Sequence, residues 1–169
     1  MRKPSEIGEA PSAAGAGAAA IPPSPLEAHL GYWLRFVSNQ VLHAFAQKLA
    51  GRGVTAAEWV VLRELYEAEA VVPSALAERL GMTRGAISKL ADRLAGKGLA
   101  ARAANAADRR FQTLALTAAG RALVPALAAL ADANDQEFFG HLAPAERAAI
   151  EAAMREIVRR QGLRAVPVD

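Results

Sequence analysis

A cluster of basic residues in the middle of the chain has the composition of a polyanion-binding surface. Residues 84–110 include seven basic and only two acidic side chains, whereas the whole 169-residue chain carries a formal charge of only +3. The basic residues of this segment are Arg84, Lys89, Arg93, Lys97, Arg102, Arg109 and Arg110. A positive segment on an otherwise slightly acidic body is typical of proteins that bind nucleic acid.

The first half of this segment predicts a helix with one apolar and one basic face. Thr83 is a good helix-capping residue, and the apolar residues after it recur at intervals of three and four. These apolar residues are Ile87, Leu90, Ala91 and Leu94. The opposite face of such a helix carries Arg84, Gly85, Ser88, Lys89, Asp92 and Arg93.

This basic face has the chemistry needed to read duplex DNA. An α-helix fits the major groove, which is about 12 Å wide, and its N-terminal residues lie nearest the base edges. Arg84 can pair bidentately with guanine, Ser88 and Lys89 can donate to bases or phosphates, and Gly85 permits a close approach. The helix N-terminus at Thr83 favours a phosphate. The alternative is a solvated basic face on an ordinary core helix.

A hairpin after this helix carries a second set of cationic groups. Residues 99–103 and 111–116 predict two short strands joined by a turn at 104–108. Asp108, Arg109 and Arg110 then lie at the tip, where arginine can enter a narrow minor groove. We expect Asp108 to pair with Arg110 and orient it, since both lie on one side of an extended strand. The alternative is a hydrated turn with an incidental ion pair.

The segments before the basic cluster predict helices that position it. Ser24 to Glu27 reads as a capping box that opens a long helix to about Ala50, and Thr55 to Glu58 reads as a second capping box. The helix that follows Thr55 extends to about Ala68. A brief helix over 74–80 ends at Gly81, so that it and the basic helix have helix-turn-helix spacing.

The segments after the hairpin predict two further helices. Thr117 caps the first, which contains Pro125 and should be kinked there. The second begins near Pro144 and ends near Gly162. The long first helix and the Leu- and Ala-rich fifth helix would expose apolar stripes on a monomer, which indicates a partner surface. A two-fold dimer would place its basic helices about 34 Å apart and predicts a palindromic site.

The fold class is therefore mostly α with a small β-hairpin wing. We expect a disordered tail over 1–24, a helical dimerisation region over 25–54 and 117–162, and a winged helix-turn-helix domain over 55–116. The Ala/Gly run at 13–20 after two basic residues only faintly imitates a secretory signal, because it lacks leucine and is flanked by proline. We expect a cytoplasmic protein.

The motifs of this region resemble those of the MarR-type winged helix-turn-helix regulators. The resemblance rests on Met82 to Leu90, on Asp92-Arg93-Leu94, and on Lys97-Gly98-Leu99. It is completed by the pattern D-x-R, eight residues before the leucine of L-T-x-x-G, formed by Asp108, Arg110, Leu116, Thr117 and Gly120. The chain is similar to the family from about Leu26 to Arg160. It departs from the usual pattern at Ala143 and Val72, where capping residues are common.

The resemblance implies a homodimeric, DNA-binding transcription regulator, usually a repressor, that binds a pseudo-palindromic operator. The first, fifth and sixth helices would form the dimer. Many members release DNA when a small aromatic or phenolic acid binds between the dimer helices and the winged domain. Candidate pocket residues here are Tyr32, Trp33, Arg35, Phe36, His43 and Trp59, with Arg35 placed to hold a carboxylate. Aromatic residues at this spacing are also ordinary core residues.

Other classes of function find little support in the sequence. There is no cysteine, which excludes thiolate metal sites and thiol chemistry. His29 and His43 would lie about 21 Å apart on one helix, too far to share a metal. Because no catalytic motif is present, we expect neither an enzyme nor a cofactor. The remaining alternative is a dimeric protein-interaction adaptor that keeps the winged fold, which would not need exposed arginines at positions 84, 109 and 110.

Overall fold

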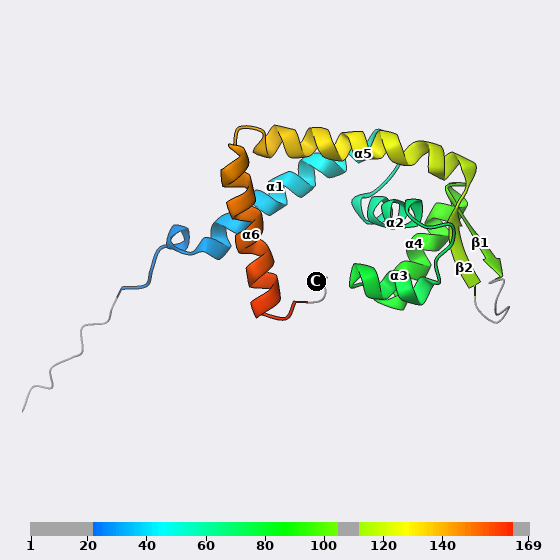
Figure 1. The fold of residues 1–169 in the computed structure, drawn as a ribbon, viewed down its shortest axis with the longest axis horizontal. Helices are drawn as coiled ribbons and strands as arrows, with labels where there is room; N and C mark the ends of the chain where they lie inside the picture. Colours follow the sequence, from blue (N-terminus) through cyan, green and yellow to red (C-terminus); the bar gives the residue numbers. More distant parts are fainter. Residues whose placement is uncertain (1–21, 105–111, 164–169) are drawn as a thin grey trace, which may run out of the picture.

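The structure is a computed structural model, and it describes residues 22–104 and 112–163. The chain forms a winged helical unit beside a set of long helices (Figure 1). The helices are η1 (Leu26–Ala28), α1 (Leu30–Ala50), α2 (Ala56–Tyr66), α3 (Pro73–Leu80), α4 (Arg84–Gly96), α5 (Ala118–Phe139) and α6 (Pro144–Arg160). The strands are β1 (Ala100–Ala104) and β2 (Gln112–Leu116). The predicted fold class, mostly α with a β-hairpin, is confirmed.

The start of the first long helix was predicted wrongly. Instead of one helix from Ser24, the chain forms the single-turn η1, and α1 begins at Leu30. Pro25 has an extended backbone and no side-chain capping bond, and His29 breaks the helix again with extended angles. A capping pattern acts only when the following turn is helical, and here the Trp33 indole instead donates to the Glu27 carbonyl at 2.9 Å. The tail expected over 1–24 falls mostly on residues 1–21, outside the described residues.

Local signals set the other helix starts as expected. The Thr55 hydroxyl accepts from Glu58 N at 3.2 Å, and the Glu58 carboxylate accepts from Thr55 N at 2.8 Å, so the second capping box is confirmed. Thr117 caps α5, which continues unbroken past Pro125. At Ala143 the capping side chain is missing, and only Glu146 reaches back to the Ala143 N–H. The third helix begins at Pro73, one residue earlier than predicted.

The hydrophobic core lies inside the winged unit. Most buried apolar residues come from α2, α3, α4, the hairpin and the first half of α5, and Leu49 at the end of α1, Val54 and Val71 complete the set. The described residues of α6 contribute none. The two strands pair antiparallel with Ala100 opposite Leu116. Val71 adds a single bridge to Leu114, with both backbone hydrogen bonds under 3.0 Å. This one-residue bridge ties the segment before α3 to the two-stranded hairpin.

A polar contact sets α1 against α5. Lys48 Nζ on α1 donates to Asn134 Oδ1 and to Glu137 Oε2, each at 2.8 Å, and Asn134 Nδ2 donates to the Val41 carbonyl at 3.2 Å. Asn134 is only 4% exposed, so these bonds satisfy an amide that would otherwise be costly to bury. Figure 1 shows α5 running from the hairpin to α6, with α1 crossing it.

The long helices leave a large apolar surface uncovered. Although α1 is rich in apolar residues, Leu49 is the one that is buried, and Trp33 and Val37 are 48% and 42% exposed. On α6, Ile150 and Met154 are each 46% exposed. The four exposed residues Trp33, Val37, Ile150 and Met154 line an apolar groove of about 810 Å³ between α1, the end of α5, and α6. We call it the α1–α6 groove.

Candidate DNA interface

The interface is built on a helix-turn-helix formed by α3 and α4. Gly81 ends α3 in a left-handed conformation, with φ at 62°, which glycine adopts without steric cost. Met82 N donates to the Ala77 carbonyl at 2.9 Å and closes the turn. Thr83 Oγ1 then accepts from Ala86 N at 3.1 Å and starts α4. The geometry of the turn is therefore encoded locally.

The two faces of α4 are those that the sequence predicts. Ile87, Leu90, Ala91 and Leu94 are all buried. The residues on the opposite face are exposed, apart from the half-buried Ser88: Arg84, Gly85, Lys89, Asp92 and Arg93. Among the described residues, Arg84, Lys89 and Arg93 have no ion-pair partner. Three cations are thus presented outward by one rigid helix, and their contact with DNA remains a prediction.

Gly85 has no packing role inside the protein. A Cβ added at this position would meet only Thr83 Oγ1, at 4.0 Å, which is ordinary contact. Glycine in a helix costs up to about 1 kcal/mol relative to alanine. The intramolecular packing therefore gives no reason for a glycine here, whereas close approach of a ligand to the helix would.

The hairpin is described only in its strands. Asp108, Arg109 and Arg110 lie outside the described residues, so their proposed roles at the wing tip remain predictions. On β1, Arg102 Nη2 lies 2.8 Å from Asp92 Oδ1 and 3.2 Å from Ser88 Oγ. Sequence reasoning counted Arg102 as one of the basic residues but did not find this contact, because no local pattern links positions 88, 92 and 102.

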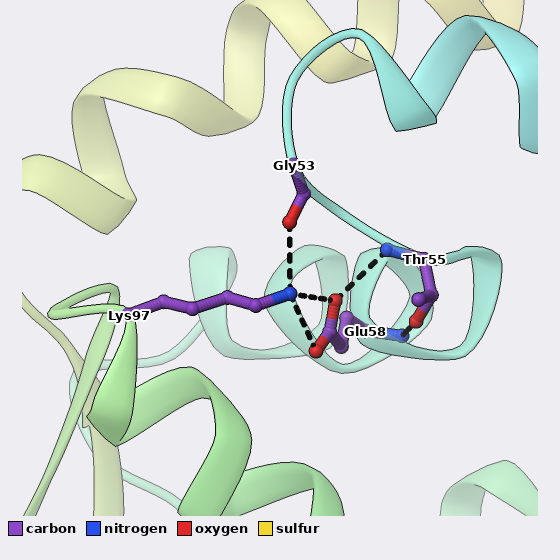
Figure 2. Close-up of polar contacts among 4 residues, drawn as sticks. All are labelled: Gly53, Thr55, Glu58 and Lys97. Atoms are coloured by element: carbon purple, nitrogen blue, oxygen red, sulfur yellow. Dashed lines mark hydrogen bonds and ion pairs between the residues drawn. The ribbon is translucent and has the colours of Figure 1, made fainter.

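An ion pair between a partly exposed lysine and a buried glutamate attaches the far end of α4 to α2 (Figure 2). Lys97 Nζ donates to both carboxylate oxygens of Glu58, at 2.8 and 2.7 Å, and to the Gly53 carbonyl at 2.8 Å. Glu58 is 1% exposed and also accepts from Thr55 N. Burial by itself raises the pKa of Glu58, but hydrogen bonds from Lys97 and Thr55 outweigh it and hold the pKa below its ordinary value of 4.5.

This ion pair changes the interpretation of the basic cluster. Lys97 is engaged with α2 and with the turn after α1, and Arg102 is engaged with α4. Both cations therefore act inside the protein. The positive charge that the described part of the interface offers to a ligand comes mainly from Arg84, Lys89 and Arg93.

The six predicted pocket residues do not line one cavity within a protomer. Tyr32 stacks on Phe36 with ring centroids 6.4 Å apart, and both lie with Arg35 on a shallow cavity of about 500 Å³ along α1. Trp33 faces the α1–α6 groove instead. Trp59 packs edge-to-face on Phe45 against the core, and His43 Nε2 lies 2.9 Å from Gln47 Nε2. A ligand role for this set remains a prediction.

The described residues contain neither a cluster of metal ligands nor a membrane-spanning helix. Within 22–104 and 112–163, no three His, Cys, Asp or Glu side chains come together as a metal site would require. No helix in these ranges combines the length and apolar character needed to cross a bilayer.

Comparison with known proteins places the interface in a family. Residues 52–110 match a model of the MarR family. A putative transcriptional regulatory protein for the hcr operon of Thauera aromatica is 31% identical over 134 residues, which are 77% of this chain and 79% of the relative. This chain belongs to the MarR family. Its members are transcriptional regulators, and the predicted resemblance is confirmed.

Solved structures of MarR family proteins share the fold. The structure of Bordetella bronchiseptica BpsR, described as regulated in DNA binding by 6-hydroxynicotinic acid, has a TM-score of 0.72 and 30% identity, covering 80% of this chain and 97% of BpsR. A mutant of Escherichia coli MarR complexed with operator DNA has a TM-score of 0.71 and 27% identity, covering 76% and 93%. The winged helix-turn-helix described above is thus the family's DNA-binding fold.

Proposed function

We propose that this MarR family protein is a cytoplasmic homodimeric repressor that binds a pseudo-palindromic operator. The observation that carries the proposal is the outward face of α4, where Arg84, Lys89 and Arg93 are exposed around a glycine that the fold does not need. Arg84 and Lys89, with Ser88, read the major groove in this proposal. Arg110 enters the minor groove, and Arg109 is a further DNA-binding residue.

The uncovered apolar surface supports the dimer. The α1–α6 groove holds Trp33, Val37, Ile150 and Met154 at the surface of the protomer, where burial would gain roughly 25 cal/mol per Å² of apolar area. A second copy brings an identical apolar surface. The residue ranges 25–54 and 117–162 then form the dimerisation region, and 55–116 forms the DNA-binding domain.

Operator selection from randomised duplexes, followed by titration of the selected sequence, tests the reading role of Arg84. Arg84→Ala should cost about 1–3 kcal/mol and relax the preference at one base pair of each half-site. Arg84→Lys is the matched control, since it keeps the charge but loses the bidentate fork. It should retain affinity for random DNA and lose the base preference. Equal losses on operator and random DNA for Arg84→Ala would contradict the base-reading role.

We further propose that a small aromatic acid releases the DNA. The support is the cavity on α1 that Tyr32, Arg35 and Phe36 line, together with the regulation of BpsR DNA binding by 6-hydroxynicotinic acid. A guanidinium beside aromatic rings suits an aromatic carboxylate. Titration of 6-hydroxynicotinic and hydroxybenzoic acids into a preformed DNA complex should lower its affinity in the wild type and have less effect in Arg35→Ala. An effect that survives in Arg35→Ala would place the effector elsewhere.

A further inference from the structure

Arg102 links the hairpin to α4, the proposed DNA-reading helix. Its Nη2 atom donates to Asp92 Oδ1 at 2.8 Å and to both the hydroxyl and the carbonyl oxygen of Ser88 at 3.2 Å. Its Nη1 atom donates to Gln112 Oε1 on β2 at 3.3 Å. A single guanidinium on β1 therefore contacts β2 and two residues of α4.

The geometry of this link follows from the helix period. Ser88 and Asp92 are four residues apart and lie on the same face of α4. Arg102 approaches that face from β1, and its planar fork carries several donors in fixed directions. A lysine at this position would offer a single point charge and could not satisfy the same acceptors at once.

The charge balance also favours an internal role for Arg102. Asp92 is the one acidic residue of α4, its side chain is 69% exposed, and it lies among cations that face the proposed DNA. Left unpaired, its carboxylate would repel phosphate. Arg102, which is 31% exposed, neutralises that charge from within the protein.

We propose that Arg102 is a positioning residue for DNA recognition, which holds the hairpin against α4 through Asp92 and Ser88. The hairpin and α4 then bind the duplex as one rigid unit. The inference rests on the proposed function, but it assigns to Arg102 a role that is distinct from contacting DNA. Three measurements test it, one without DNA and two with it.

Hydrogen exchange of the free protein tests the link itself. Asp92→Asn and Arg102→Met should each raise amide exchange in the β1–β2 pairing by about tenfold, corresponding to about 1.4 kcal/mol. Glu67→Gln is the matched control, because Glu67 pairs with Arg63 on α2 and its side chain is equally exposed, at 68%. It should leave the hairpin unchanged. Unchanged exchange in both test variants would overturn the proposal.

Affinity for the selected operator and for a scrambled duplex tests the role in recognition. Asp92→Asn adds one unit of positive charge, so simple electrostatics predicts tighter binding to both duplexes. The proposal instead predicts a several-fold loss in the ratio of operator to scrambled affinity, which Glu67→Gln does not show. Tighter binding of Asp92→Asn to both duplexes, with an unchanged ratio, would overturn it.

The salt dependence separates positioning from phosphate contact. Arg102→Met should leave the slope of log affinity against log salt unchanged on scrambled DNA, whereas losing a phosphate contact lowers the slope by about 1. A lowered slope would overturn the proposal. A wild-type protein that prefers no duplex would overturn the proposed function, while the exchange result would still decide the link. If Arg102→Met does not fold, the exposed Asp92→Asn variant decides the exchange and affinity measurements.

Discussion

Gly85 destabilises α4 relative to alanine, and no packing contact inside the protein requires a glycine at this position. Gly85→Ala should raise the free energy of unfolding by up to about 1 kcal/mol, since the added methyl meets nothing closer than 4.0 Å. The same methyl would stand between α4 and the base edges, so operator affinity should fall by about tenfold, or about 1.4 kcal/mol. Thermal unfolding and operator titration of one preparation measure both effects.

Gly96 supplies the matched control for that substitution. It lies at the other end of α4, and an added Cβ there meets nothing within 4 Å. Gly96→Ala should stabilise the protein to a similar extent without changing operator affinity. If both variants bind the operator like the wild type, Gly85 does not lie at the interface.

Glu58 links pH to the stability of the winged unit. Because its pKa in the folded protein lies below the ordinary value of 4.5, the ionised carboxylate stabilises the fold above that value. The contribution is lost as the pH falls through the lowered folded-state pKa. Glu58→Gln should therefore lower the free energy of unfolding by about 1–3 kcal/mol near neutral pH, with a difference that shrinks in acid.

Denaturant unfolding at several pH values measures the free energy of unfolding of Glu58→Gln, and Glu67→Gln is the control. Glu67 caps the C-terminal end of the same helix, but its ion pair with Arg63 is exposed and should contribute at most about 1 kcal/mol. A stability difference for Glu58→Gln that does not change between neutral and acid pH would show that the charge of Glu58 is not the source of its effect.

At the scale of elements, Gly120 shows why α5 can start where it does. An added Cβ at Gly120 would lie 2.0 Å from the Leu99 carbonyl oxygen, which is backbone and cannot swing away. Thr117 holds the same junction, since its hydroxyl donates to the Gly98 carbonyl at 2.6 Å and accepts from Gly120 N at 3.0 Å. The glycine of the L-T-x-x-G motif thus lets the start of α5 pack on the turn that follows α4.

The expected consequence is a loss of stability. Gly120→Ala should lower the free energy of unfolding by about 1–3 kcal/mol, because helix and turn must separate to admit the methyl group. Gly31→Ala on α1, where an added Cβ meets nothing within 4 Å, should be neutral or stabilising. Chemical denaturation of the two variants measures the contrast, and equal stabilities would rule out the close packing at Leu99.

At the scale of the whole molecule, the proposed homodimer places the α1–α6 groove at its interface. Val37 lies in the groove and is 42% exposed in the protomer, so Val37→Asp should leave the protomer folded but place a charge in the proposed dimer interface. Sedimentation at several concentrations should then show a monomer, with operator affinity reduced at least about 100-fold by loss of the second half-site.

Val60 provides the matching substitution outside the groove. It is a valine on α2 with 36% exposure and does not line the groove. Val60→Asp should remain dimeric. If Val37→Asp sediments as the wild type does, the groove is not the dimer interface.

The features that the sequence predicted correctly depend on residues close together in the chain. The caps at Thr55, Thr83 and Thr117, and the end of the third helix at Gly81, are set by hydrogen bonds and backbone sterics within a few residues. The failure at Ser24 shows the limit of such signals. A capping pattern with no packed helix after it does not determine a helix start.

Contacts between segments distant in the sequence needed the tertiary structure. The sequence by itself determined the α4 periodicity, because the helical repeat alone assigns Ile87 and Leu94 to one face and Arg84 to the other. Only the fold decided that Lys97 pairs with Glu58, which is 39 residues away in the chain. It likewise decided that Arg102 pairs with Asp92, which is 10 residues away. Such pairs form because packing brings the elements together, and no local spacing encodes that approach.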